Sequence, residues 1–184
     1  MLVCVFLFVL AMGNLIVWRD IWQGSSFLVV FFDVGQGDSI FMKSPWGHTV
    51  LIDGGPDTRV EEKIGKNLLP WKKHIDLVIL SHPDKDHMFG LIGVLKRFRV
   101  DTVYWTGVRR KTAEYAAWER QLIGQNTALA RAPQRILWTR NQSQYADILS
   151  PIKDYAGRVM DMSNESGIVA RLVVPNHVVL LTSD

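Results

Sequence analysis

The sequence predicts a layered α/β protein with a mixed sheet, and two patterns carry that prediction. Short segments rich in β-branched and aromatic residues, each bounded by turn residues, predict strands. Segments of helical composition lie between them, and strand-like segments open and close the domain. We expect one globular domain over residues 27–184, which begins after a polar juncture at 19–26 and is long enough to bury a sizeable core.

The first elements of this domain are a strand, a hairpin and a helix. Phe27–Asp33 is β-branched and aromatic and is followed by glycines, which favours a buried strand. Ser39–Lys43 and Thr49–Ile52 flank a turn that contains proline and glycine, so they predict a hairpin. Residues 58–69 have helical composition and stop at Pro70, because the residue before a proline avoids the helical conformation.

The later elements alternate between strands and helices. Ile75–Leu80 predicts a buried strand that leads directly into a cluster of histidines and aspartates. Gly90–Phe98 predicts a helix because its large apolar side chains fall on one stripe. The remaining predicted elements are a strand over 100–105, a helix over about 111–130, a strand near 136–139, and a closing hairpin of 167–174 and 178–182 around a turn at 175–177.

The N-terminus differs from the rest of the chain. Residues 1–18 contain no charged side chain, and only Gly13 and Asn14 interrupt the apolar run. Such a helix is at the short end of what crosses the ~30 Å hydrocarbon layer. No Lys or Arg precedes the run, which favours a retained anchor over a cleaved signal peptide. We therefore predict a transmembrane or signal-anchor segment at residues 1–20, with a buried core helix as the alternative.

Composition excludes a disulfide-stapled domain and is compatible with a phosphate-bearing substrate. The single cysteine, Cys4, lies inside the apolar run, so the domain cannot be a disulfide-stapled framework. The net charge of +3 is a mild basic balance that would suit a phosphate-bearing substrate without requiring one.

The sharpest chemical feature is a group of four potential metal ligands within six residues, namely His82, Asp84, Asp86 and His87. A turn that leaves a buried strand can aim alternate side chains at one point, and the next helix N-terminus stabilises carboxylates there. Imidazole and carboxylate ligands suit Zn²⁺, Mn²⁺ or Fe, and no thiolate lies nearby. This pattern favours a catalytic metal site over a polar loop with a capping aspartate and two solvent histidines.

The segment resembles the signature loop of the metallo-β-lactamase superfamily, H-x-H-x-D-H, in the H-x-D-x-D-H variant of the C-terminal domain of ComEC-type DNA-internalisation competence proteins. Three more motifs are similar to that subgroup and occur in the same order: Asp33–Ser39 to "DVGQGD", Leu51–Gly55 to "LIDGG", and Leu181–Asp184 to the end of "LLTGD". The resemblance implies an αββα sandwich, apparently truncated at the C-terminus, and two divalent metal ions, zinc or manganese.

The resemblance also implies roles for individual residues. The implied ligands are His82 and Asp84 for one metal, Asp86 and His87 for the second, and Asp184 as the bridge between them. Asp86 would in addition orient the bridging water or accept its proton, which makes it the implied catalytic residue. Three residues would lie beside the metals without binding them, with ordinary turn chemistry as the alternative: Asp53, Gln36 and Asp38.

The chain departs from the family pattern in two respects. Many members supply a further histidine before the bridging aspartate, but none occurs between residues 88 and 176. His177 falls in a predicted turn, so we expect it at the surface, whereas Asn164 and Ser166 lie where the subgroup has an Asn/Ser motif. The sequence also ends before the last histidine-bearing segment and final helix of the family.

Phosphodiester hydrolysis is the natural chemistry of two divalent ions about 3.5–4 Å apart. The resemblance adds single-stranded DNA as the partner, during uptake at the bacterial cell membrane, with the membrane side undetermined and no protein partner indicated. Basic and aromatic residues that could hold DNA are Trp71–His74, Arg97, Arg99, Trp105 and Arg109–Lys111, although such charge runs are more often solvated loops. The alternatives are a hydrolase of small acyl compounds (a lactone, thioester or β-lactam) and a non-catalytic DNA-binding domain of a competence channel.

Overall fold

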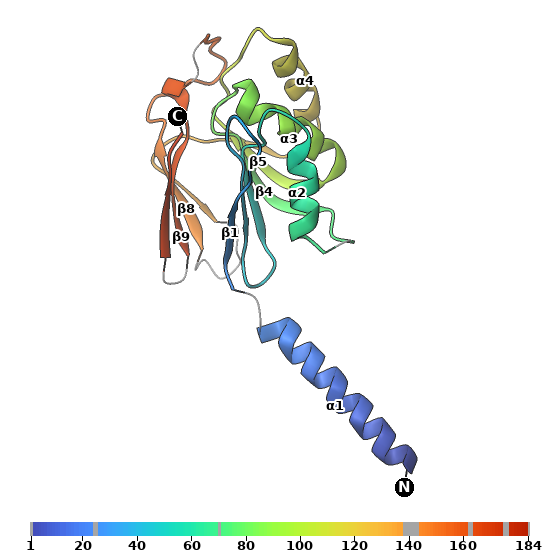
Figure 1. Ribbon diagram of the computed structural model, residues 1–184. Helices are drawn as coiled ribbons and strands as arrows, with labels where there is room; N and C mark the ends of the chain where they lie inside the picture. Colours follow the sequence, from blue (N-terminus) through green and yellow to red (C-terminus); the bar gives the residue numbers. More distant parts are fainter. Residues whose placement is uncertain are drawn as a thin grey trace.

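The computed structural model describes residues 2–23, 26–69, 71–137, 144–161, 164–174 and 177–183. Two sheets lie face to face, and helices cover the outer face of the larger sheet (Figure 1). This arrangement confirms the predicted α/β layered fold with a mixed sheet. The described residues hold three layers of the expected αββα sandwich, since no α-helix among them follows α4 (Ala113–Leu122).

The larger sheet contains six strands in the order of the sequence. They are β1 (Leu28–Phe31), β2 (Ile40–Lys43), β3 (Thr49–Ile52), β4 (His74–Ile79), β5 (Arg99–Trp105) and β6 (Thr127–Leu129). The hairpin of β2 and β3 is antiparallel, as predicted, whereas β3, β4, β5 and β6 run parallel. The carboxyl ends of the parallel strands therefore meet at one edge, where ligand sites of open α/β sheets lie.

Helices connect the parallel strands and bury one face of this sheet. α2 (Arg59–Asn67) joins β3 to β4, α3 (Lys85–Arg97) joins β4 to β5, and α4 joins β5 to β6. Their apolar side chains form the first core together with those of the sheet; members from both layers are Leu51, Val78, Val103, Ile64, Leu91, Val94 and Trp118. Helix α2 confirms the helix predicted over 58–69.

Two helices differ from their predicted extents. α3 begins at Lys85 and not at residue 90, with Asp84 in extended conformation at its N-cap. Asp86 lies in the first turn, where the helix dipole favours a negative charge. α4 ends at Leu122, and β6 follows where the helix was expected to continue to residue 130. Gly124, with φ of 83°, accounts for this early end because it adopts a left-handed conformation that a helix cannot continue.

The smaller sheet packs on the other face and is antiparallel throughout, in the order β10, β9, β8, β7. Its strands are β7 (Gln134–Leu137), β8 (Tyr145–Ser150), β9 (Val169–Val174) and β10 (His177–Leu181). The closing hairpin is confirmed, but His177 begins β10 because it pairs with Val174. The strand expected near 136–139 appears as β7, with 138 and 139 outside the described residues, and β8 was not predicted.

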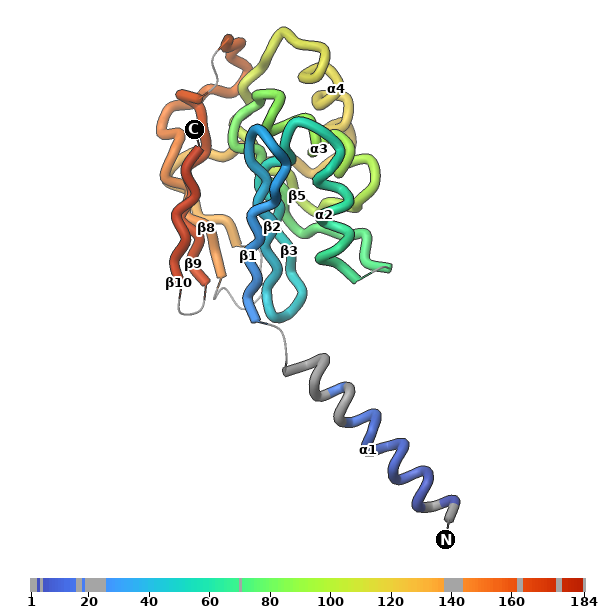
Figure 2. The backbone as a smooth tube through the Cα atoms, viewed as in Figure 1, coloured from blue at the N-terminus to red at the C-terminus, as the bar shows by residue number. Residues whose placement is uncertain are grey.

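Helix α1 (Leu2–Gln23) projects from the domain as a separate rod (Figure 1, Figure 2). Apolar side chains along it, such as Phe6, Phe8 and Leu15, are exposed. In the described part of the chain, no helix is both long enough and apolar enough to cross a membrane. The membrane segment at residues 1–20 stays a prediction.

An ion-pair network ties together three strands of the smaller sheet. Asp147 on β8 lies directly opposite Arg135 on β7 and Arg171 on β9. Its Oδ1 accepts a hydrogen bond from Arg135 Nε at 2.6 Å, and its Oδ2 accepts one from Arg171 Nη2 at 2.7 Å. The hydrogen bonds from Arg135, and then those from Arg171, hold the pKa of Asp147 below its ordinary value of 3.8. The carboxylate therefore stabilises the fold in its ionised form.

We expect Asp147→Asn to lower the free energy of unfolding at pH 7 by about 0.5–1 kcal/mol, the size of a cross-strand charge pair in contact with solvent. Because the folded-state pKa is depressed, this stabilisation is present above about pH 4 and is lost as pH falls through the folded-state pKa. Urea unfolding from pH 7 to pH 3 measures both effects. Asp154→Asn, which removes an exposed partner of Arg131, is the control and should change little. Equal stability of wild type and Asp147→Asn at pH 7 would refute the role of the network.

Candidate metal centre

Two turns and one helix meet at the carboxyl edge of the larger sheet (Figure 1). Asp53 directly follows β3, and Ser81 and His82 follow β4, the neighbouring parallel strand. His87 lies in the first turn of α3, at the end of the same loop. The fold thus carries potential ligands and their supporting residues from three consecutive elements to one place.

Asp53 connects these elements through its carboxylate, which is buried. Its Oδ1 accepts a hydrogen bond from Ser81 N at 2.7 Å, and its Oδ2 lies 2.6 Å from Ser81 Oγ and 2.9 Å from His87 Nδ1. Asp53 also has a φ of 56°, a left-handed conformation that is costly for a residue with a side chain. Backbone strain of this kind concentrates at functional sites, where the surrounding structure maintains it.

The two histidines of the motif lie against each other inside the protein. His82 and His87 are each 1 % exposed, and their ring centroids are 4.1 Å apart. His82 Nδ1 lies 3.0 Å from Ser81 Oγ and 3.1 Å from Ser183 Oγ, while His87 Nδ1 faces Asp53. Since both Nδ1 atoms contact protein groups, either ring would bind a metal through Nε2.

The two aspartates of the motif are held from different sides. Asp84 Oδ2 lies 3.7 Å from His82 Nε2, and its Oδ1 lies 2.8 Å from Arg110 Nη1. Asp86 Oδ2 accepts a hydrogen bond from Gln36 Nε2 at 3.3 Å. The structure therefore brings His82, His87 and Asp84 together, and it ties Asp86 to the loop after β1.

Four other residues singled out in the sequence have different outcomes. Gln36 contacts the motif aspartate Asp86, and its role beside the metals stays a prediction. Asp38 is exposed, and its backbone carbonyl accepts a hydrogen bond from Gly55 N at 3.0 Å, which fits a turn role. Asp184, the implied bridging ligand, lies outside the described residues. His177 is exposed at the start of β10, as expected of a surface residue.

A family model described as the metallo-beta-lactamase superfamily matches residues 32–184. The chain belongs to this superfamily. Membership confirms the broader part of the sequence resemblance. The comparisons do not single out the ComEC-type subgroup.

Two solved structures of the superfamily are similar to this chain. One is a metallo-β-lactamase from Cronobacter sakazakii, a mutant of the HARLDQ motif, with a TM-score of 0.50 and 14 % identity over 84 % of this chain and 60 % of that one. The other is the Rm3 metallo-β-lactamase, with a TM-score of 0.50 and 18 % identity over 88 % of this chain and 62 % of that one. This chain thus spans less than two thirds of their length, and the likeness shows the fold alone. No curated protein matches the chain.

The donors present fit a divalent cation, the kind of ion that this superfamily binds. Two buried imidazoles lie side by side, tilted by 45° to each other, next to a carboxylate, and each ring has its Nδ1 held by a protein group. Supporting contacts of this kind orient metal-binding histidines. The residues that would hold metal are His82 and His87 through Nε2, with Asp84 and Asp86 through their carboxylates.

Sequence reasoning missed two side chains beside the candidate metal centre. Ser183 contacts His82, and its position next to Asp184 in the fourth motif was the available signal. Arg110 was considered only as part of the basic run 109–111. The side chains of this run point in different directions, since Arg109 pairs with the half-buried Glu119 at 3.1 Å while Arg110 turns inward to Asp84.

Close backbone contact between α3 and the turn after β3 positions His87. Gly54 N donates to the His87 carbonyl oxygen at 2.7 Å, and Gly90 N donates to the Gly55 carbonyl oxygen at 3.0 Å. A Cβ atom on Gly90 would collide with the Gly54 carbonyl oxygen. Only a residue without a side chain at position 90 therefore lets the helix approach closely enough for His87 to reach Asp53.

We expect Gly90→Ala to lower the free energy of unfolding by roughly 3 kcal/mol, because the added methyl group must push α3 away from the turn. Zinc affinity should fall with it, since His87 moves with the helix. Gly65→Ala is the matched control: its Cβ would meet no atom within 4 Å in helix α2, so it should stabilise by up to about 1 kcal/mol. Urea unfolding and zinc titration measure the two quantities, and equal stability of the two variants would contradict the packing argument.

Proposed function

We propose that this superfamily member is a metal-dependent phosphodiesterase that cleaves DNA, with single-stranded DNA as its substrate and DNA uptake as its setting. The observation that carries the proposal is the position of Arg110, whose side chain is only 19 % exposed and lies 2.8 Å from Asp84. A guanidinium beside a metal centre is suited to a substrate with phosphoryl oxygens, which it can bind with two parallel hydrogen bonds. The four ordered motifs shared with ComEC-type proteins support the same substrate.

In this proposal each residue has a distinct task. Divalent ions bound at His82, Asp84, Asp86 and His87 would supply an activated water and neutralise charge on the phosphoryl group. Arg110 binds a non-bridging phosphoryl oxygen and orients the phosphodiester. Asp86 orients the attacking water or accepts its proton, and Gln36 holds the other side of that carboxylate. Asp53 keeps the proton of His87 on Nδ1, so that the Nε2 lone pair faces the metal.

Several DNA contacts expected from the sequence lie far from this centre. Arg99 begins β5, at the amino end of the strand, and Trp71 precedes β4 at the same end. Trp105 packs against Tyr115 and Trp118 of α4, with ring centroids 6.5 and 6.3 Å apart, so it belongs to the core. Of the proposed contacts, Arg110 is the one that borders the candidate centre. Location at the bacterial cell membrane remains a proposal that rests on the motif resemblance.

Hydrolysis of a small acyl compound, such as a lactone, thioester or β-lactam, is the second candidate. Its support is the likeness in fold to two metallo-β-lactamases. A domain that binds DNA without cutting it is the third candidate, and its support is the absence of a histidine between residues 88 and 176. Comparing turnover of phosphodiester and acyl substrates by the same protein separates these candidates.

The full chain loaded with Mn²⁺ or Zn²⁺ is expected to cleave bis(p-nitrophenyl) phosphate and single-stranded DNA. Asp84→Ala and His87→Ala should each reduce turnover roughly 100-fold or more, because each removes a metal ligand. His177→Ala removes an exposed histidine of β10 and should retain wild-type turnover. If the metal-loaded wild type leaves both phosphodiesters intact, or turns over acyl substrates faster, the proposal fails.

Arg110→Ala is expected to raise KM for bis(p-nitrophenyl) phosphate roughly tenfold or more, the effect of losing a hydrogen bond to a charged group. KM for the neutral ester p-nitrophenyl acetate should stay unchanged, and Arg110→Lys should recover part of the loss. Arg109→Ala is the matched control, since Arg109 pairs with Glu119 and not with the centre. Zinc titration of each variant separates substrate binding from metal binding. An equal rise in KM for both substrates would show that Arg110 does not bind the phosphate.

A further inference from the structure

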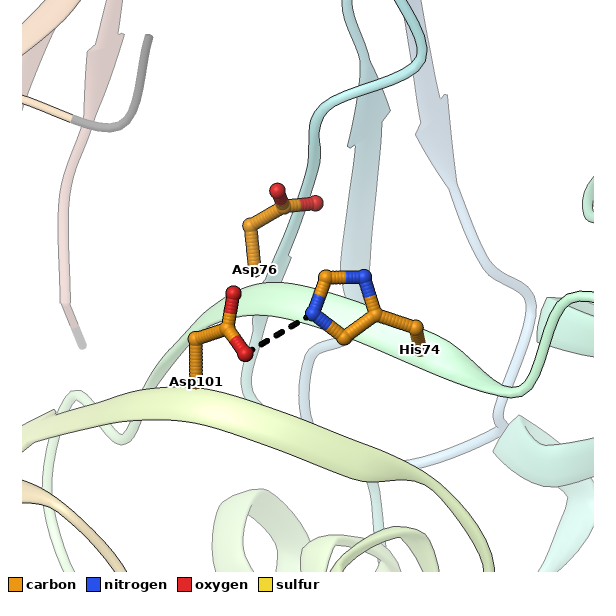
Figure 3. A group of neighbouring side chains, drawn as sticks. All are labelled: His74, Asp76 and Asp101. Atoms are coloured by element: carbon orange, nitrogen blue, oxygen red, sulfur yellow. Dashed lines mark ion pairs between the residues drawn. The ribbon is translucent and has the colours of Figure 1, made fainter. Parts of the chain in front are cut away.

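A second group of potential metal ligands lies at the other end of the larger sheet. His74 and Asp76 are on β4, and Asp101 is on the neighbouring strand β5 (Figure 3). One ligand atom of each residue lies within 4.8 Å of the other two. His74 begins the strand that leads to His82, so the two groups are roughly 20 Å apart at the rise of an extended chain.

We propose that His74, Asp76 and Asp101 form a second binding site for a first-row divalent metal ion, zinc being the expected ion, with His48 as the fourth ligand. Two imidazole nitrogens and two carboxylate oxygens are ligands that zinc accepts in a four-coordinate site. The site is separate from the candidate hydrolase centre and does not depend on the proposed reaction.

The pair of His74 and Asp101 already has the spacing of neighbouring ligands. His74 Nε2 lies 2.9 Å from Asp101 Oδ1, and Figure 3 shows both groups pointing toward each other beside Asp76. Ligands of a tetrahedral zinc ion are separated by about 3.3 Å when each lies about 2.0 Å from the ion. A small outward movement of the two side chains therefore makes room for the ion.

Asp76 is anchored in a way that suits a metal ligand. Its Oδ2 accepts hydrogen bonds from Thr49 N at 2.7 Å and from Thr49 Oγ1 at 2.8 Å. Its Oδ1 lies 3.0 Å from His48 Nδ1. Carboxylates that bind metals are commonly held by hydrogen bonds on one oxygen in this manner. The same contact places the imidazole of His48 next to Asp76, where it can serve as the fourth ligand.

Solvent and charge also favour an ion here. A surface hollow of about 650 Å³ is lined by His74, Asp101, Arg99 and Trp71, among others, and gives an ion a path to the site. The two carboxylates balance the charge of a divalent cation. Arg99 Nε competes for Asp101 at 3.7 Å, but its side chain is 83 % exposed, and solvent weakens such a pair.

An ion at this position would join β4, β5 and the turn that leads into β3. Because the site exists only in the folded chain, zinc bound there stabilises the protein by mass action. The ion would thus fix the amino ends of the same strands whose carboxyl ends carry the candidate hydrolase centre.

The test compares metal-free full-length chains titrated with zinc chloride. His74→Gln/Asp101→Asn is expected to bind one zinc fewer than wild type, or to bind it roughly tenfold or more weakly, and to lose part of the zinc-dependent rise in Tm. His87→Ala, which alters the other centre, should retain the zinc of the new site. His177→Ala removes an exposed histidine of β10 and should retain all bound zinc. Unchanged stoichiometry, affinity and rise in Tm in His74→Gln/Asp101→Asn overturn the proposal.

X-ray absorption at the zinc edge provides a second measurement that needs no variant of the new site. In a zinc-loaded chain that lacks both motif histidines, His82→Ala/His87→Ala, we expect imidazole nitrogen and carboxylate oxygen ligands around the retained ion, and a shell of water oxygens alone would overturn the site. Turnover of bis(p-nitrophenyl) phosphate by His74→Gln/Asp101→Asn is a readout of the other centre, so failure of the hydrolase proposal and failure of this site are distinguishable.

Discussion

The carboxylate of Asp53 is the contact on which the candidate centre depends, because it joins the ends of β3 and β4 to the first turn of α3. A buried carboxylate costs several kcal/mol unless hydrogen bonds replace its water. Here the amide and hydroxyl of Ser81 and the imidazole of His87 supply them. The same bonds offset the strained backbone of Asp53 and fix the direction of His87.

Backbone packing brings the donors close, and side chains then define the chemistry. Gly54 and Gly90 allow α3 to touch the turn after β3, which places His87 against His82. The two imidazoles and Asp84 form a donor set for a divalent ion, in keeping with membership of the metallo-β-lactamase superfamily. Arg110 adds a positive charge at the same place, which is the feature that favours a phosphodiester as substrate.

The sequence predicted what depends on local pattern. Buried strands such as β4 appear as runs of β-branched and aliphatic residues, and the metal motif was visible from its spacing. The sequence did not predict the features that depend on tertiary contacts. β8 turns only Ala146 and Ile148 fully inward, a signal too short to separate it from a loop. The spacing of residues in the sequence does not predict that α3 starts within the motif, because this start depends on contact between α3 and the glycine turn after β3. It also does not predict that Arg110 turns inward, because Arg110 pairs with Asp84, which is distant in the sequence.

The zinc dissociation constant of Asp53→Asn, compared with that of the unaltered centre, tests the central claim most directly. Both chains should carry His74→Gln/Asp101→Asn, so that the titration follows one centre. If Asp53 holds the His87 proton on Nδ1 and orients the ring, Asp53→Asn should bind zinc roughly 10–100-fold more weakly. Unchanged helical circular dichroism would show that the variant is still folded. An equal dissociation constant in the two folded chains would contradict the account.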